Sequence, residues 1–327
     1  LIPLSIFIGV LSGVISSANL EPSSAIFFLD GLSRLFVLLI SGIGTLIMLY
    51  THGYLKGDIF QGRFMFYMMA FMGSMLGLVM SNHLLFLFIF WELTSFTSYL
   101  LIGFNHENED ARSAALQAML VTVVGGLALL AGIILLADIG GSWYVSDLFS
   151  RGEIIRNNEL YVPILILIAL GAFTKSAQFP FHFWLPGAMQ APTPASAYLH
   201  SSTMVKAGVY LLAKMSSILG GTIEWSALLI TIGGVTFLLG AIMALGQHIL
   251  KRLLAYTTVS ALGAMVMLIG IGSKYTIKAM IIFLIAHAFY KAALFMIAGS
   301  LTHETGEKSI DKPVSYTHLR AHETTEH

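Results

Sequence analysis

Apolar residues run in long, nearly uninterrupted stretches along this chain, and short polar segments separate them. The stretches are apolar on every side instead of at alternate positions, which favours buried or lipid-facing helices over strands of a β-barrel. About 20 apolar residues in a helix cross a hydrocarbon core of about 30 Å. We therefore predict about ten membrane-spanning helices: 1–19, 31–50, 64–81, 83–104, 114–137, 161–178, 194–219, 225–246, 253–271 and 276–301.

The polar segments between these spans predict the connections. Only "SNH" separates the third and fourth spans, so we expect a tight hairpin there. The longest connection, 138–160, is expected to be a surface loop. Lys and Arg occur in similar numbers on both sides, so their distribution does not fix the orientation in the membrane. The pattern predicts neither a short-period repeat nor a soluble domain.

The composition agrees with a membrane protein, since 57% of the 327 residues are hydrophobic and 10% are charged. A soluble domain carries roughly 25% charged residues. Lys and Arg total 17, as do Asp and Glu, which gives no indication of a nucleic-acid partner. The absence of cysteine excludes disulfides, thiolate metal sites and cysteine-ligated iron–sulfur clusters. The fold class is therefore predicted to be all-α and polytopic.

The two ends of the sequence are unusual. The chain begins with "LIPLSIFIGVLSGVI", without an initiator Met or a basic leader, so we expect a fragment that starts inside a membrane segment. The segment 314–327 is polar and rich in histidine, unlike the rest. We interpret it as an artefactual tail, with a disordered tail as the alternative. His318, His322 and His327 are not interpreted as a metal site.

Ionisable residues inside the apolar stretches are the candidates for function, because a charge in the bilayer normally faces a partner or a wet cavity. Glu92 lies near the middle of its span and is followed by Thr94, Ser95, Thr97 and Ser98. This polar run indicates that one side of the helix packs against other helices or faces water. A neutral Glu92 in an interhelical hydrogen bond is the alternative.

Lys175 lies towards the end of its apolar stretch, and Pro180 follows. Proline removes a backbone donor and clashes with the preceding turn. An interruption at membrane depth is tolerated only where the freed backbone is buried in protein or lines a cavity. A lysine beside such a break can exchange its proton as its hydration changes, which suits a proton carrier. A lysine that reaches the membrane surface is the alternative.

Two further spans carry histidine and lysine together. His200, Thr203 and Lys206 follow one another in steps of three, which predicts a polar stripe on one helix face. His287 and Lys291 are four residues apart and predict a pair one turn apart. We interpret both as parts of a proton relay. For His200, a satisfied interhelical hydrogen bond is the alternative.

Other ionisable residues lie near segment ends. Lys251 lies beside His248 and Arg252 at a junction, where cations at the membrane edge are the ordinary interpretation, but it remains a candidate for the relay. Structural roles are expected for Asp30, Arg34 and His52, and the roles of His83 and His182 stay open.

Together these residues suggest a lateral proton path. In this hypothesis Glu92 and Lys175 form a switchable ion pair. When the pair closes, Lys175 holds its proton, and when it opens, the proton passes on. The later carriers are His200, Lys206, Lys251, His287 and Lys291.

Four stretches resemble a known family: "FWELTSFTSYLLIGF", "TKSAQFPFHFWLPGAMQAPTPASAYLHSSTMVKAGVYLL", "KRLLAYTTVSALG" and "AHAFYKAALFM". They are similar to the proton-translocating family shared by Mrp-type multisubunit cation/proton antiporters and the antiporter-like subunits of respiratory complex I. The resemblance covers roughly 30–301. Within the family, the first two stretches resemble most the large A subunit of Mrp antiporters, and the L-type subunit of complex I comes second.

The resemblance implies two inverted five-helix repeats, each with an interrupted helix. The first would cover about 64–219, and the second would start near 225 and be cut off. The proton-translocating domain would then be 30–313, after a partial N-terminal helix and loop at 1–29. It also implies that Glu92 is the family's essential glutamate and Lys175 the lysine of the first interrupted helix.

The resemblance assigns the remaining candidates as well. His200, Lys251, His287 and Lys291 match polar residues of the family's central axis, and Lys206 matches a lysine typical of A-type sequences. Many relatives carry an acidic residue two positions before Lys251, where this chain has Ile249, so a local carboxylate partner for Lys251 is not expected.

The implied function is a subunit of a multisubunit Na⁺/H⁺ antiporter in a prokaryotic cell membrane. Its partners would be other membrane subunits and the lipid bilayer, with H⁺ and Na⁺ as transported ions, no cofactor, no metal and no catalytic chemistry of its own. The main alternative is a proton-pumping L-type subunit of an NADH:quinone oxidoreductase. A passive scaffold, or a redox subunit that binds haem through His83, His200 or His287, is less favoured.

Overall fold

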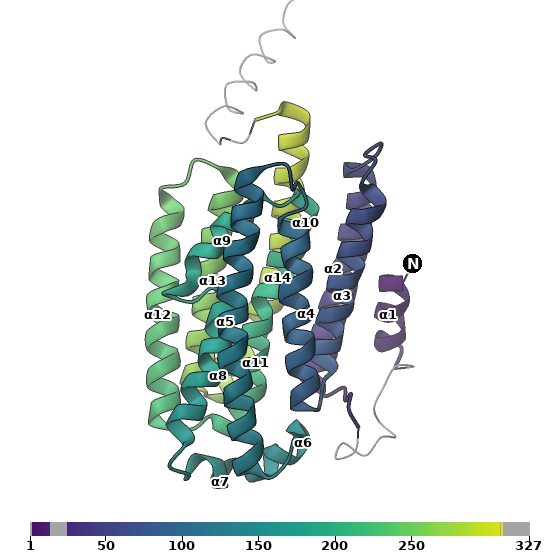
Figure 1. The fold of residues 1–327 in the computed structure, drawn as a ribbon. Helices are drawn as coiled ribbons and strands as arrows, with labels where there is room; N and C mark the ends of the chain where they lie inside the picture. Colours follow the sequence, from purple (N-terminus) through teal and green to yellow (C-terminus); the bar gives the residue numbers. More distant parts are fainter. Residues whose placement is uncertain (1, 14–24, 308, 310–327) are drawn as a thin grey trace, which may run out of the picture.

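Long helices that run up and down side by side make up most of the chain (Figure 1). The computed structural model describes residues 2–13, 25–307 and 309, so the predicted tail at 314–327 lies outside the described residues. The longer helices are α1 (Ile2–Leu11), α2 (Gly31–Tyr54), α3 (Gln61–Met80), α4 (Leu84–Ile102), α5 (Glu109–Gly140), α8 (Tyr161–Lys175), α10 (Thr193–Ser201), α11 (Met204–Leu219), α12 (Ile223–Leu245), α13 (Leu250–Ile271) and α14 (Lys274–Thr305).

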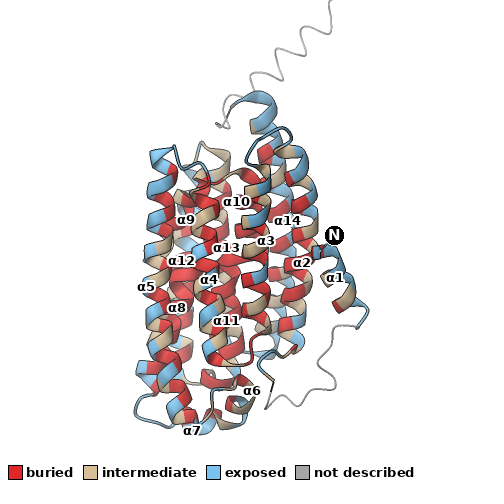
Figure 2. Cartoon of the chain, turned by 45° about the vertical axis from the view of Figure 1, so that its right-hand side comes forward, coloured by how far each residue is buried: buried red, intermediate tan, exposed pale blue. Residues whose placement is uncertain are grey.

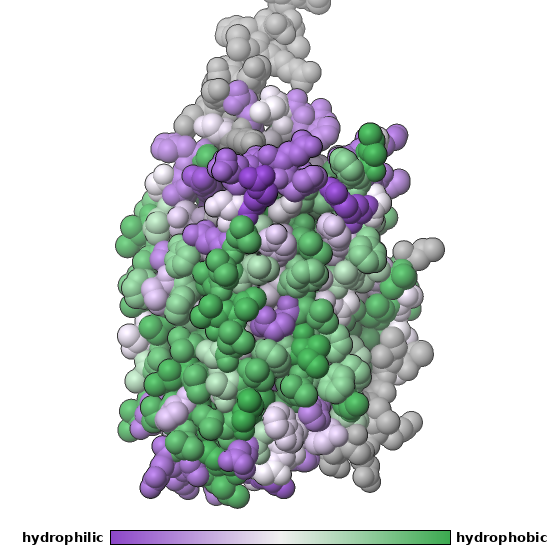
Figure 3. Space-filling model, in the orientation of Figure 1, coloured by the Kyte–Doolittle hydropathy of each residue, from purple (hydrophilic) through white to green (hydrophobic). Residues whose placement is uncertain are grey.

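The bundle has the surface of a membrane protein. Within the described ranges, seven helices are long and apolar enough to cross a membrane: α2, α3, α4, α5, α12, α13 and α14. On the face shown in Figure 3, apolar residues form a band across the middle of the molecule, and hydrophilic residues gather at its two ends. Buried residues line the inner sides of the helices (Figure 2). The prediction of an all-α polytopic membrane protein is confirmed.

Three of the expected spans differ from the prediction. The helix at the start has only 10 described residues, and α8 has 15. The expected single span at 194–219 is two helices, α10 and α11, which are separated at Ser202 and Thr203. The Thr203 hydroxyl donates to the Tyr198 carbonyl at 2.6 Å, and such a local bond competes with the helical ladder. The prediction of one continuous stripe through His200 and Lys206 was therefore wrong.

The chain leaves the helical conformation directly after Lys175, as Pro180 predicted. Three short segments follow: η2 (Phe181–Phe183), α9 (Trp184–Gly187) and η3 (Ala188–Gln190). The indole of Trp184 donates to the Thr174 carbonyl at 2.9 Å, and the Phe179 N–H donates to the Thr236 hydroxyl of α12 at 2.9 Å. The freed backbone groups thus find partners within the protein, as a membrane interior demands.

The connection at 138–160 is more ordered than the simple surface loop that we predicted. It contains α6 (Val145–Leu148), η1 (Phe149–Arg151) and α7 (Gly152–Arg156). Arg156 donates to the Ile218 carbonyl at 2.9 Å, so this segment is attached to the end of α11. The tight hairpin between α3 and α4 is confirmed, and Asn82 within it connects to Ala25 and Ser146.

An ion pair between a buried lysine and a partly buried aspartate joins the start of α2 to α11. Asp30 caps α2 by accepting from the Ser33 N–H at 2.7 Å, and its other carboxylate oxygen bonds the Lys214 ammonium. The Lys214 side chain is 5% exposed and that of Asp30 is 26% exposed. Burial raises the pKa of the Asp30 carboxyl, but Lys214 and Ser33 outweigh it and hold the pKa below its ordinary value. The expected structural role of Asp30 thus has a partner, Lys214, that the sequence did not reveal.

We expect Asp30→Asn to destabilise the folded protein by about 3 kcal/mol, because the buried Lys214 loses its counter-ion. Asparagine still caps the helix, so the effect isolates the ion pair. The thermal midpoint of the purified protein measures it. Because the pKa of Asp30 is lower when folded, the pair stabilises above about pH 4 and is lost as the pH falls through the folded pKa. The variant should therefore lose less stability on acidification, and equal losses in both proteins would contradict this assignment.

Candidate functional site: buried lysines and histidines beside the helix breaks

Lys175 is the last residue of α8, and its side chain is fully buried. Its ammonium donates to the Trp91 carbonyl at 2.9 Å and to the Ser95 hydroxyl at 2.6 Å, both on α4. It also lies 5.1 Å from the centroid of the Trp91 ring. All three partners are neutral, so the charge of Lys175 is held by dipoles and an aromatic face instead of by a carboxylate.

Glu92 follows Trp91 on α4 and is half-buried beside α5. Its Oε1 atom is buried and has no hydrogen-bond partner in the described protein. Within the same residues, no ion pair joins Glu92 to Lys175 within 4.0 Å. The Glu92 side chain fits against α5 because the residue opposite it is Gly126. A Cβ atom at position 126 would lie only 1.8 Å from the Oε1 atom of Glu92. Glu92 and Lys175 are thus neighbours that are not in contact.

Lys206 is fully buried in the first turn of α11, just after the break between α10 and α11. Its ammonium bonds the Ser201 carbonyl, which the break frees from the helical ladder, and donates to the Leu284 carbonyl of α14 at 3.1 Å. The helix that carries it packs closely on α8. A Cβ atom at Gly208 would lie 2.2 Å from the Ala172 carbonyl oxygen, which explains the glycine.

One face of α14 gathers the remaining candidates. His287 and Lys291 are buried on it, one turn apart as predicted. The Lys291 ammonium donates to the Leu254 carbonyl at 2.8 Å and to the Thr257 hydroxyl at 2.5 Å, both on α13. His200 of α10 stacks on Phe295, one turn further along, with ring centroids 5.5 Å apart.

The two histidines differ from the lysines in their bonding. Both ring nitrogens of His200 and of His287 are buried and have no hydrogen-bond partner among the described residues. Phe283 and Tyr290 pack against the His287 ring instead. The alternative of a satisfied interhelical hydrogen bond at His200 is therefore not what the structure shows. An imidazole with two free nitrogens can accept a proton at one and release it at the other.

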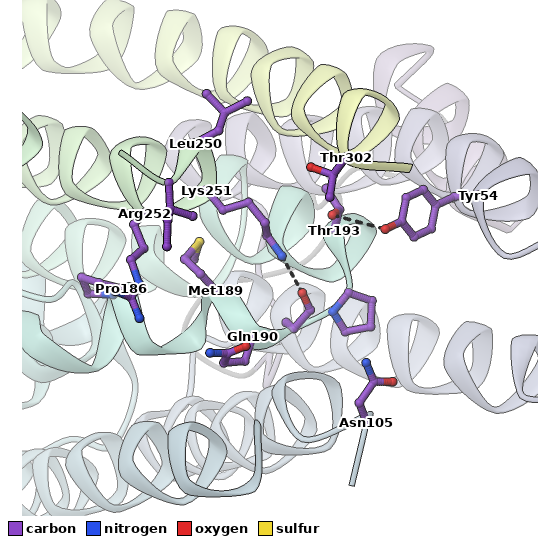
Figure 4. A pocket seen from close by; sticks show the side chains of 13 residues that line it. Tyr54, Asn105, Pro186, Met189, Gln190, Thr193, Leu250, Lys251, Arg252 and Thr302 are labelled. Atoms are coloured by element: carbon purple, nitrogen blue, oxygen red, sulfur yellow. Dashed lines mark hydrogen bonds between the residues drawn. The ribbon is translucent and has the colours of Figure 1, made fainter. Parts of the chain in front are cut away.

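Lys251 lies at the start of α13 and lines a cavity of about 330 Å³ at one end of the bundle (Figure 4). Its ammonium reaches across the cavity and donates to the Ala191 carbonyl at 2.6 Å, beside the interrupted segment. Polar side chains of Gln190, Thr193 and Asn105 share the lining. Lys251 is only partly buried and lies at this polar opening, in contrast to the fully buried Lys175 and Lys206.

His83 and His182, whose roles were left open, make their hydrogen-bond and ring contacts outside these clusters. His83 caps α4, since its Nδ1 atom accepts from the Leu85 N–H at 3.2 Å. Burial lowers the pKa of His83, which keeps the imidazole in the neutral form that this bond requires. His182 packs on Phe179 in the interrupted segment. The described residues contain no group of three or more His, Asp or Glu side chains arranged to hold a metal ion.

The sequence prediction missed the neutral partners of the lysines. Ser95 and Thr257 hold Lys175 and Lys291 through their hydroxyls. The other partners of the lysines are the carbonyls of Trp91, Ala191, Ser201, Leu254 and Leu284. Ser95 was noticed only as part of a polar run. Carbonyl groups carry no sequence signal, so only the fold could identify them.

Comparison with known proteins places the chain among antiporter and complex I subunits. Residues 81–323 match the family described as "NADH:quinone oxidoreductase/Mrp antiporter, TM". Residues 15–65 match the N-terminal family of complex I chain 5. The chain is 46% identical over 313 residues to the A subunit of the Na⁺/H⁺ antiporter of Alkalihalophilus pseudofirmus, covering 89% of this chain and 39% of that protein.

Other relatives agree. The A/B subunit of a probable K⁺/H⁺ antiporter of Rhizobium meliloti is 48% identical over 282 residues, covering 86% of this chain and 28% of its own length. A chain in the structure of the Mrp complex from Dietzia sp. DQ12-45-1b is 39% identical, with a TM-score of 0.78, covering 90% of this chain and 32% of that one. The archaeal membrane-bound sulfane sulfur reductase shares the fold, with a TM-score of 0.81 at 21% identity, covering 95% of this chain and 65% of that one.

The chain spans well under half the length of the antiporter subunits that it matches. The match to residues 81–323 nevertheless includes most of the sequence and all of the buried lysines and histidines described above. The chain therefore belongs to the family of transmembrane subunits shared by NADH:quinone oxidoreductases and Mrp antiporters.

Proposed function

We propose that this chain is the proton-translocating part of an A-type subunit of a multisubunit Na⁺/H⁺ antiporter in a prokaryotic cell membrane. The relatives named as antiporter A subunits support the assignment. The observation that carries it is the set of buried ammonium groups at Lys175, Lys206 and Lys291, each at most 1% exposed. Each is held by neutral oxygens beside a helix break or across a helix interface.

This arrangement suits proton transfer for a physical reason. A buried ammonium without a counter-ion keeps its charge only against a large desolvation cost. Small changes in hydration, or in the position of a nearby carboxylate, then decide whether it holds its proton. The neutral carbonyl and hydroxyl partners can bond the amine in either form, so the surroundings need not rearrange when the proton leaves.

The first step would take place between Glu92 and Lys175. In the structure the two are not in contact, and Lys175 is held by Trp91 and Ser95 on the same helix as Glu92. In this step a rotation of the side chains would bring the carboxylate to the ammonium, and the closed pair would hold the proton there. Opening the pair would release that proton towards α11.

The later steps would follow the contacts with α14. Lys206 bonds the Leu284 carbonyl, one turn from His287, and His287 lies one turn from Lys291. Lys291 bonds the Leu254 carbonyl, one turn from Lys251 at the polar cavity. His200, stacked on Phe295 of the same helix, would join this line. We also propose that α3 to α11 form the first of two inverted repeats, as the family resemblance implies.

The test uses the complete polypeptide with its partner subunits in proteoliposomes. An imposed Na⁺ gradient should move protons, read by a pH-sensitive dye, and Lys206→Ala should slow this exchange about 100-fold. Lys278→Ala is the matched control, because Lys278 is exposed on α14. Proton movement that needs NADH and quinone, with no response to Na⁺, would instead assign the chain to the proton-pumping arm of an oxidoreductase.

A further inference from the structure

A second polar pocket lies away from the relay, where α3 begins, α4 ends and α5 begins. It has a volume of about 270 Å³, and its polar lining is Arg63, Tyr67, Tyr99, His106 and Arg112. These elements end at the boundary between the apolar band and the hydrophilic end of the molecule (Figure 3). None of these residues has a part in the proposed proton path.

Arg63 is fixed in this pocket by two aromatic rings. Its guanidinium carbon lies 4.5 Å from the centroid of the Phe60 ring and 4.9 Å from that of Phe104. The Nε atom is buried and has no hydrogen-bond partner within the described protein. A guanidinium offers five N–H donors in a rigid plane. Arg63 therefore presents an oriented set of donors that no described residue uses.

Arg112 adds a second positive charge to the pocket. It is exposed, and among the described residues its side chain makes one hydrogen bond, a long one of 3.4 Å to the His106 carbonyl. In the part of the chain that the structure describes, no carboxylate lies within 4.0 Å of either guanidinium. The pocket thus combines two cations, and its tyrosine hydroxyls are available as further donors.

We propose that this pocket binds a phosphate group, and that the phosphate belongs to the headgroup of an anionic phospholipid. Paired guanidinium groups match the geometry of phosphate oxygens. Tyrosines at the edge of the apolar band are typical of the membrane interface. Phe66 and Phe96, which are 68% and 54% exposed, lie one turn deeper on α3 and α4 and offer an apolar surface to acyl chains.

The experiment uses the complete subunit in its assembled complex, purified in detergent and depleted of lipid. Phosphatidylglycerol is titrated in, and bound lipid is counted by native mass spectrometry. The double variant that carries Arg63→Gln and Arg112→Gln should bind phosphatidylglycerol at its tightest site at least about tenfold more weakly. The reason is that the charge-assisted bonds from the two guanidinium groups to the phosphate are lost. Arg34→Gln, an exposed arginine on α2, is the matched control and should leave that binding unchanged.

Further arms separate the sources of phosphate. Arg112→Gln alone changes an exposed side chain whose one hydrogen bond among the described residues is the long one to the His106 carbonyl. A weakening by this single change therefore supports the site even if the double variant assembles poorly. Inorganic phosphate that displaces the lipid only at millimolar concentrations would support a lipid site. Equal competition by inorganic phosphate would overturn the lipid assignment, and unchanged lipid binding in the arginine variants would overturn the site itself. If a cross-linker placed at position 112 captures another protein of the complex and no lipid, the lipid site is overturned and the pocket is a contact with a partner subunit.

Discussion

Replacing Lys175 by methionine should lower Na⁺-driven proton exchange by at least about 100-fold, the range expected when a group that transfers protons is removed. Methionine fills a similar volume, so the buried end of α8 stays packed. The amine that bonds Trp91 and Ser95 is lost, and the proposed path then has no carrier between α4 and α11. Proteoliposomes with equal amounts of assembled complex give the measurement.

Lys278 provides the matched control for the Lys175 variant. Lys278→Met changes an exposed lysine on α14 in the same way and should leave exchange intact. Full exchange by the Lys175→Met complex, at wild-type expression and assembly, would remove Lys175 from the mechanism. The proposal would then have to start from another buried lysine.

Gly126→Ala should slow exchange almost as severely as the loss of Glu92 itself, by about 10- to 100-fold. A Cβ atom at this position of α5 would lie 1.8 Å from Oε1 and 2.9 Å from Cδ of Glu92. The carboxylate is the end of a flexible side chain, so it moves aside and the fold is retained. No titratable group is removed, yet the carboxylate can no longer return to the open position opposite Gly126, so the pair with Lys175 can no longer switch.

Gly73→Ala is the matched control for this substitution. Gly73 lies on α3, and a Cβ atom there would meet nothing within 4 Å. Its exchange rate should equal that of the wild type. If Gly126→Ala exchanges protons normally while Glu92→Ala does not, the position of the carboxylate is unimportant and only its presence matters. That result would contradict the switchable pair.

Hydropathy was enough to predict the membrane class and the long helices, because the seven spans satisfy their backbone bonds internally and need only apolar surfaces. Pro180 was enough to predict the first interruption. The break at Ser202 and Thr203 could not be predicted from the sequence, since both residue types are common inside membrane helices. The contact of Lys206 with the Leu284 carbonyl depends on the fold, so it could not be predicted either.

The candidate site shows a similar division. The position of a charge inside an apolar stretch was enough to single out Lys175, Lys206 and Lys291 together with the two buried histidines, because burial of such groups requires a reason. It did not single out Lys214, which is also buried. Their partners could not be predicted, since most are backbone carbonyls. The Lys214 ion pair was missed because the partner, Asp30, is far away in sequence and lies at a helix end.

The bond from the Phe179 N–H to the Thr236 hydroxyl has a mechanical consequence. Thr236 also donates to the Ile232 carbonyl of its own helix, so its hydroxyl is fixed with respect to α12. A displacement of the segment after Lys175 must either break this bond or pull α12 along with it. The segment that follows Lys175 is thus tethered to α12 at the place where the chain leaves α8, and the tether can transmit force as well as hold position.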